Sequence, residues 1–305
     1  FMKTLFKYAT VVLLLAGTSA CSQPSKRASI IDENIAVAEK QIGMLADSSE
    51  TGGVIRIPST WKNGRIDYVP VDDWVSGFFA GTLWYMYELT GDETWAARAR
   101  KHTEILDSVQ YLQWHHDVGF MVYEDVIVQT AKSLATRFRP VPGVIQSWDA
   151  DRGWQGERGW QCPVIIDNMM NLELMFKATE FSGDSTYYNI AVKHADRTMK
   201  EHFRDDYSCY HVVDYDLTTG DVRGRCTAQG YADDSAWARG QAWAVYGYTA
   251  CYRYTGDKRY LDHARKVAGF MLGDKNMPAD LVPYWDYDAP NIPNEPRDVS
   301  TAAII

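Results

Sequence analysis

Hydrophobic positions recur along most of the chain with the period of an amphipathic helix, and the expected helices come in pairs. The same joint links the two helices of a pair three times: Gly-Asp-x-x-aromatic at 91–95, 183–187 and 256–260. Glycine supplies a left-handed C-cap for the first helix, and the aspartate after it caps the second. The pattern predicts repeated helical hairpins, which bury their apolar faces by stacking on neighbours.

The joints and the periodicity together predict the order of elements. We expect, in chain order, an amphipathic helix at 30–46, a loop with strand character at 52–70, a helical hairpin at 73–107, a helix at 124–137, a helical hairpin at 163–202, a β-hairpin at 210–224, a helical hairpin at 235–272 and the start of another helix at 298–305. The first helix of each pair is rich in aromatic and small residues, whereas the second carries charges on one face. This difference predicts an inner and an outer ring of helices. The expected fold is therefore all-α, an α/α toroid with one small β-hairpin.

The toroid is expected to be incomplete at two places. Gly119 and Tyr123 take the joint positions almost directly after Asp117, which leaves no room for an inner helix there. A new helix begins near Asp298, just before the sequence stops, so the last hairpins are also expected to be missing. Three explanations stay open: omitted segments of a longer protein, a natural truncation, or a decayed gene copy.

The N-terminal segment has the pattern of an export signal. Two lysines precede an apolar run at 11–16, and small residues then lead to Cys21. This resembles a bacterial lipoprotein cleavage site with Cys21 as the lipidated residue, while ordinary cleavage after Ala20 stays open. The run is too short to span a bilayer. We therefore expect a signal segment at 1–21 and a single domain at 28–305 in an exported protein, periplasmic or membrane-anchored.

Charge and cysteine content exclude several classes of protein. The net charge of −9 disfavours a nucleic-acid partner. The few cysteines after Cys21 show no zinc-site spacing, although Cys209 and Cys226 flank the expected β-hairpin and a disulfide between them stays open. The sequence also has no phosphate-binding loop, dinucleotide fingerprint or serine nucleophile elbow. The 11 Trp and 19 Tyr suit either a large helical core or a sugar-binding surface.

An acidic residue precedes or opens each expected inner helix. These residues are Asp73, Asp117, Asp167, Asp234 and Asp298. Helix capping explains most of them, but in a toroid the inner N-termini share one mouth, where several carboxylates also suit acid–base catalysis. Asp167 follows three apolar residues, so we expect burial to raise its pKa. Asp117 follows Trp-His-His at 114–116, groups that can hold a carboxylate.

Two further positions are candidates for ligand contacts. Arg239 and Trp243 lie four residues apart and so share one helix face, where they can clamp a carboxylate and stack on a sugar. A buried helix with a paired arginine is the alternative. His211, on the expected β-hairpin, is either a strand-face histidine or a ligand contact.

Three segments in this order resemble one family of enzymes. They are His-Asp-Val-Gly-Phe at 116–120, Ile-Asp-Asn-Met-Met-Asn-Leu at 166–172 and Trp-Ala-Arg-Gly-Gln-Ala-Trp at 237–243. The set is similar to the unsaturated glucuronyl hydrolases, glycoside hydrolase family 88, over about 73–305. The resemblance implies an (α/α)6 toroid without a metal or other cofactor. It also implies a substrate left by polysaccharide lyases, whose terminal uronate carries a C4=C5 double bond.

The resemblance also implies a mechanism and a set of site residues. An acid protonates C4 of the vinyl ether, water adds at C5, and the hemiketal collapses to release the partner sugar. Asp167 would be the general acid/base, and Asp117 would assist by hydrogen-bonding the substrate. The positions implied for substrate binding are His116, His211, Gln229, Arg239 and Trp243, with Trp74 as a stacking wall.

Two other functions compete with this interpretation. The unsaturated rhamnogalacturonyl hydrolases share the fold and the vinyl-ether chemistry, but the His116-Asp117 pair and the segment 239–243 favour the glucuronyl type. The other alternative is a non-catalytic, lipid-anchored sugar-binding relic, in which Asp167 would be dispensable. The expected partner is an unsaturated oligosaccharide, and membrane contact is expected only through an N-terminal lipid anchor.

Overall fold

The computed structural model describes residues 26–117 and 126–305. The chain divides into two units, 1–51 and 52–305, and the described part of the first is the helix α1 (Lys26–Ser49). Cys21 and the export segment lie outside the described residues, as do Gly119 and Tyr123, on which the missing inner helix was inferred. Within the described ranges, no helix is long and apolar enough to cross a membrane.

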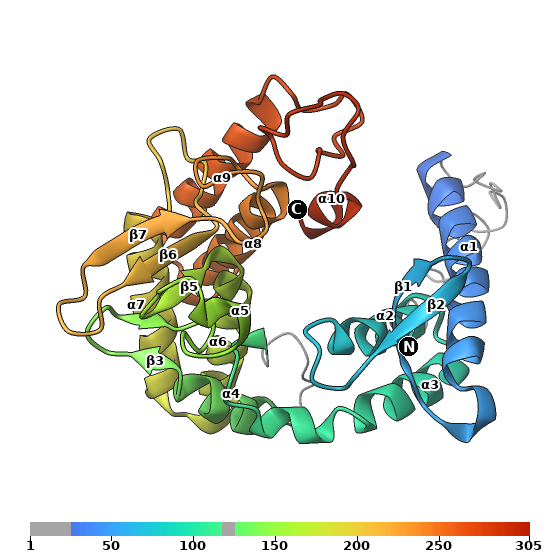
Figure 1. Ribbon diagram of the computed structural model, residues 1–305. Coiled ribbons are helices and arrows are strands. Elements are labelled where there is room, and N and C mark those ends of the chain that lie inside the picture. The colour runs from blue at the N-terminus through green and yellow to red at the C-terminus, as the bar shows by residue number, and fades with distance from the viewer. Residues whose placement is uncertain (1–25, 118–125) are drawn as a thin grey trace, which may run out of the picture. The chain divides into compact units, whose positions relative to one another are not determined.

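The three predicted helical hairpins are confirmed. They are α2 (Ser76–Thr90) with α3 (Glu93–Glu104), α6 (Asn171–Ser182) with α7 (Ser185–Glu201), and α8 (Ala238–Thr255) with α9 (Lys258–Gly273) (Figure 1). Each pair turns at a left-handed glycine: φ is 69° at Gly91 and 72° at both Gly183 and Gly256. The aspartate after each glycine accepts a hydrogen bond of 2.8–2.9 Å from the backbone N–H two residues later. The joint residues therefore cap both helices as the sequence indicates.

The β-structure includes the predicted hairpin and the segment with strand character at 52–70, and it extends beyond both. The strands are β1 (Ile57–Lys62), β2 (Arg65–Val69), β3 (Phe138–Arg139), β4 (Val144–Ile145), β5 (Pro163–Ile165), β6 (Val212–Tyr215) and β7 (Val222–Cys226). They form the antiparallel sheets β1–β2, β3–β4 and β5–β6–β7. The predicted hairpin is β6–β7, and β5 joins it because Val164 pairs with Val213. Strand β5 ends at Ile165, directly before the 3₁₀ turn Ile166–Met170 that contains Asp167. The sheet therefore fixes where this turn begins.

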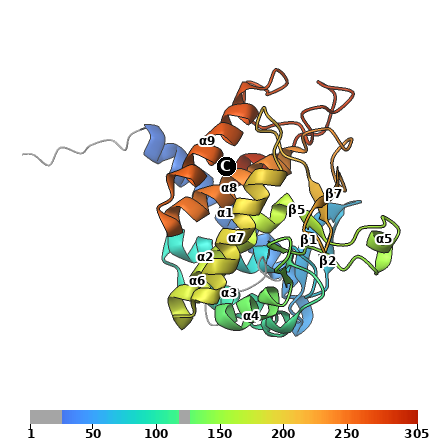
Figure 2. The same ribbon diagram turned by 90° about the vertical axis from the view of Figure 1, so that its left-hand side faces the viewer.

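Helices α6 and α8, the first helices of the second and third pairs, pack on one another. The remaining helices are α4 (Ile127–Ala135), α5 (Gly153–Gly156) and α10 (Val299–Ile304). Helix α8 lies against both α6 and α10, whereas α7 and α9 lie mainly against their own partners (Figures 1 and 2). Met169, Leu172 and Met175 are fully buried between these layers with Tyr248. The contacts agree with the predicted inner and outer positions.

Two glycines let α8 approach the segment that carries Asp167. Gly240 and Gly247 lie seven residues apart, on one face of the helix. A Cβ on Gly240 would lie 3.1 Å from Ile166 Cγ2, and one on Gly247 would lie 2.4 Å from Met169 Cβ. The backbone of α8 therefore packs directly on the 3₁₀ turn Ile166–Met170.

We expect Gly247→Ala to lower the free energy of unfolding by about 1–3 kcal/mol, because the new methyl group overpacks this contact. Thermal and urea unfolding measure the loss. The matched control is Gly269→Ala on α9, where an added Cβ meets nothing within 4 Å. This control should stabilise the protein by about 0.5–1 kcal/mol through helix propensity. Equal effects of the two changes would contradict the close approach.

The disulfide considered for the β-hairpin is absent. Cys209 and Cys226 are both free, as are Cys162 and Cys251. Burial raises the pKa of the Cys209 and Cys226 thiols, so both are held as unreactive thiols rather than thiolates.

Candidate active site

Asp167 lies in the 3₁₀ turn between β5 and α6, against α8, and is 7% exposed. Burial raises the pKa of Asp167 to about 7, and the negative charge of Asp117 acts in the same direction. The Arg239 charge and a hydrogen bond from Trp243 oppose this shift of the pKa. The carboxyl group is therefore partly protonated at neutral pH, as general acid catalysis requires. The predicted desolvation by the preceding apolar strand is confirmed.

His211 presents a ring proton to Asp167. Its Nδ1 accepts backbone N–H groups from Ala228 at 3.0 Å and Gln229 at 3.1 Å. The imidazole is buried, which lowers the pKa of His211 to about 3, so the ring is neutral and its proton is on Nε2. Nε2 lies 3.6 Å from Oδ2 of Asp167. His211 therefore faces Asp167, and its role in ligand binding stays a prediction.

Asp117 lies between two histidine rings, with 20% of its side chain exposed. His115 Nδ1 is 3.2 Å from Oδ2, and His116 Nε2 is 3.3 Å from Oδ1. Burial acts to raise the pKa of Asp117, but His116, His115 and Arg137 outweigh it and hold this pKa below its usual value. At neutral pH, Asp117 is therefore ionised while Asp167 is partly protonated. The two carboxyl groups can thus take different roles, one as an acid and the other as a carboxylate.

Arg239 lies in the first turn of α8 and faces a polar cluster. Its Nη2 donates to Gln229 Oε1 at 3.2 Å, and its Nη1 lies 3.9 Å from Asp298 Oδ2. Its guanidinium lies over the ring of Trp237, 4.9 Å from the centroid. Trp243, which the sequence places on the same helix face as Arg239, hydrogen-bonds Asp167. A quarter of the Arg239 side chain remains exposed, so it can still bind an anionic ligand.

The structure brings together most of the candidate residues. Contacts or charge coupling join Asp167, Asp117, His116, His211, Gln229, Arg239 and Trp243. Among the described contacts, none links Trp74 to this group. The Trp74 ring lies edge-on to Phe78 at 5.9 Å and is 42% exposed. Its role as a stacking wall stays a prediction.

Helix capping accounts for one of the five acids in the described residues. Asp298 caps α10 by accepting from the N–H of Thr301 at 3.0 Å. Asp73 accepts from the N–H of Val75 at 3.0 Å in the turn before α2, whose N-cap is Val75. Among the described contacts, none makes Asp167 a helix cap, so capping does not explain its position.

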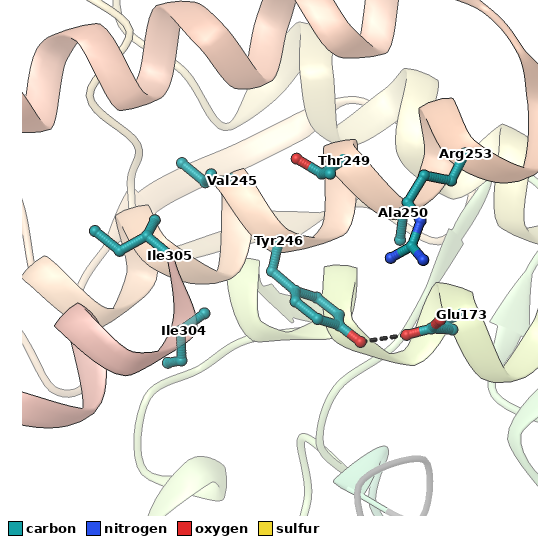
Figure 3. Close-up of a pocket in the computed structure, with 8 residues that line it drawn as sticks. All are labelled: Glu173, Val245, Tyr246, Thr249, Ala250, Arg253, Ile304 and Ile305. Carbon is teal, nitrogen blue, oxygen red and sulfur yellow. Dashed lines mark hydrogen bonds between the residues drawn. The ribbon is translucent and has the colours of Figure 1, made fainter. Parts of the chain in front are cut away.

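A hollow between α6, α8 and α10 contains none of the candidate residues (Figure 3). It is lined by Glu173, Val245, Tyr246, Thr249, Ala250, Arg253, Ile304 and Ile305. The Glu173 carboxylate accepts hydrogen bonds from the hydroxyls of Tyr246 and Tyr254, so it is already engaged. The Asp167 cluster therefore stays the candidate active site. In the described ranges, no three His, Cys, Asp or Glu side chains are arranged to hold a metal ion.

Known proteins with similar sequences are named unsaturated glucuronyl hydrolases or unsaturated chondroitin disaccharide hydrolases. The chain matches no protein-family model. It is 46% identical over 253 residues to the unsaturated glucuronyl hydrolase of Formosa agariphila, covering 78% of this chain and 62% of that protein. It is 36% identical over 268 residues to the enzyme of the same name from Bacillus sp. strain GL1, covering 80% of this chain and 68% of that protein. The chain belongs to the unsaturated glucuronyl hydrolase family.

The fold of this chain is also similar to a solved structure of the same family. An unsaturated glucuronyl hydrolase specific for heparin matches with a TM-score of 0.84 and 41% identity, over 91% of this chain and 76% of that chain. The family has an α/α-toroid fold, to which the helix-rich structure and its small sheets correspond. This chain spans only 62% of the length of its Formosa relative.

Proposed function

We propose that this protein is a glycoside hydrolase that removes 4,5-unsaturated glucuronyl residues from disaccharides released by glycosaminoglycan lyases. The observation that supports this proposal is that two neighbouring carboxyl groups have pKa values shifted in opposite directions. Asp167 has its pKa raised to about 7 by burial, whereas the pKa of Asp117 is held low by its histidine neighbours. Both lie in motifs that resemble those of the family.

The proposed reaction starts with proton transfer from Asp167 to C4 of the vinyl ether. Positive charge then develops at C5, where the ionised Asp117 stabilises it and orients the substrate. Water adds at C5 and returns a proton to Asp167, so the carboxyl group is regenerated. The resulting hemiketal opens and releases the partner sugar.

The other polar groups suit recognition of the uronate. Arg239 is held beside Gln229 and still partly exposed, so its guanidinium can bind the carboxylate of the substrate. The Nε2 proton of His211 faces the carboxyl group of Asp167. The cluster therefore offers a cation and a ring N–H beside the acid.

The rival functions make different predictions in one assay. Loss of ultraviolet absorbance from an unsaturated chondroitin disaccharide is the expected result with this 305-residue chain. Turnover of an unsaturated rhamnogalacturonyl disaccharide alone would favour the second hydrolase class. Sugar binding without any turnover, by a folded chain, would favour the binding relic.

We also propose that the toroid of this chain lacks an inner helix after Asp117. Helix α2 supports this, because Phe78, Tyr85 and Leu89 lie on one face and are 41%, 67% and 58% exposed. A neighbouring inner helix would cover such a face. Turnover by this chain would mean that the missing segment is dispensable for catalysis.

Export with a lipid anchor on Cys21 is a further proposal, supported by the lysines, apolar run and small residues before it. Metabolic labelling with a fatty acid should mark the protein in a bacterial host. Labelling that persists in Cys21→Ala would contradict the proposed anchor site.

A further inference from the structure

Two buried asparagines connect a backbone carbonyl to His116. Asn168 Nδ2 donates to the carbonyl oxygen of Ile145 at 2.7 Å. Asn171 Nδ2 donates to Asn168 Oδ1 at 2.7 Å and lies 3.0 Å from Nδ1 of His116. Asn168, Asn171 and His116 have no solvent exposure. Water therefore does not compete for these contacts.

The carbonyl oxygen of Ile145 sets the direction of each hydrogen bond in the network that leads to His116. A carbonyl oxygen only accepts, so Asn168 must turn its amide nitrogen toward Ile145 and its oxygen toward Asn171. Asn171 must then present its own amide nitrogen to that oxygen, and the same nitrogen reaches His116. An amide nitrogen only donates, so Nδ1 of His116 must accept in its contact with Asn171. Burial lowers the pKa of His116, while a side-chain hydrogen bond with Asn168 also acts on this ring in the direction that raises this pKa.

Ile145, whose carbonyl oxygen starts this hydrogen-bond network, is also held through its own backbone N–H, which belongs to the preceding peptide group. Its N–H donates to Nδ1 of the fully buried His194 on α7 at 3.0 Å. Asn168 Nδ2 is also 3.2 Å from Ser147 Oγ, which accepts the N–H of Ile165 at 2.9 Å. The orientation of Asn168 is therefore held from two segments.

We propose that Asn168 and Asn171 are positioning residues that place the ring proton of His116 on Nε2, facing Asp117. Nε2 lies 3.3 Å from Oδ1 of Asp117. A proton there stabilises the ionised carboxylate, whereas the other tautomer would set a lone pair against it. The catalytic consequence rests on the proposed hydrolase function, but the tautomer itself does not.

His211 offers an internal comparison. Its Nδ1 accepts two backbone N–H groups, so its proton is also on Nε2, near Asp167. Backbone amides cannot be removed by substitution, whereas the amide of Asn171 can. A change at Asn171 should therefore alter the tautomer of His116 and leave that of His211 unchanged.

The first test is ¹⁵N NMR of the full chain with labelled histidine, without substrate. His116→Gln identifies the His116 resonances among the seven histidines. The expected spectrum shows an unprotonated Nδ1 and a protonated Nε2 for His116 at neutral pH. A protonated Nδ1 in the unsubstituted protein would overturn the proposal, whether or not the chain turns over sugar.

The second test is Asn171→Ala, which should allow the Nδ1–H tautomer of His116 and lower kcat about 10-fold or more, with a smaller change in KM. The control is Asn276→Ala, which removes an amide hydrogen bond to the carbonyl of Tyr287 and should leave the His116 resonances unchanged. Loss of turnover with unchanged His116 resonances would reveal a structural role and overturn the proposal. Unchanged resonances with full turnover would do the same.

Discussion

Replacing Asp167 by asparagine should lower kcat by about 10³-fold or more, because the amide cannot deliver a proton to C4. Binding of the disaccharide should persist, since Arg239 and Gln229 remain in place. In the unsubstituted protein, kcat/KM should fall as pH rises above about 7, where Asp167 loses its proton. Initial rates of absorbance loss over a range of disaccharide concentrations, measured across pH, give kcat, kcat/KM and the position of this limb.

The matched control is Asp286→Asn. Asp286 is fully buried and burial raises its pKa as well, but its oxygens accept from the N–H of Tyr231 and from Ser235 Oγ. Its change should lower stability and leave kcat of the folded enzyme nearly unchanged. Full turnover by Asp167→Asn would exclude Asp167 as the general acid of the proposed reaction.

The Asp167→Asn substitution also has a predictable effect on the free energy of unfolding. The unfolded carboxyl ionises near pH 3.8, whereas folded Asp167 keeps its proton up to about pH 7. Between these values the folded state binds more protons than the unfolded state, so the raised pKa makes stability fall as pH rises. Asp167→Asn removes this contribution. The melting temperature of Asp167→Asn minus that of the unsubstituted protein should therefore increase as pH rises from 4 to 7. Above pH 7 this difference should stay constant.

Local signals in the sequence predicted the helical hairpins and the two carboxyl groups. The Gly-Asp joints succeeded because both caps use backbone groups within a few residues, so no distant contact is needed. The burial of Asp167 could be read from the apolar strand before it, and its raised pKa follows from that burial.

Contacts between distant segments were not predictable in this way. Helical spacing placed Arg239 and Trp243 on one face, but it did not indicate that the guanidinium lies over Trp237 at the N-cap of α8. The roles of Asn168 and Asn171 depend on the carbonyl of Ile145, more than twenty residues away. Two asparagines three residues apart in an apolar segment were the available signal, because buried amides need partners.

Asp117→Asn should lower kcat by about 10²-fold or more, since the neutral amide no longer stabilises positive charge at C5. It should also change the remaining activity in a specific way. The charge of Asp117 helps to raise the pKa of Asp167, so its removal lowers that pKa. The falling limb of the pH–rate profile should therefore move to lower pH.

Asp149→Asn separates this coupling from a general loss of negative charge. Asp149 pairs with Arg137 at 3.0 Å, and Arg137 also acts on Asp117, but Asp149 is not among the groups that shift the pKa of Asp167. The limb should stay in place in Asp149→Asn and move in Asp117→Asn. An unmoved limb in both variants would mean that the two carboxyl groups act independently. The division into one protonated acid and one ionised carboxylate would then arise from burial and local partners alone.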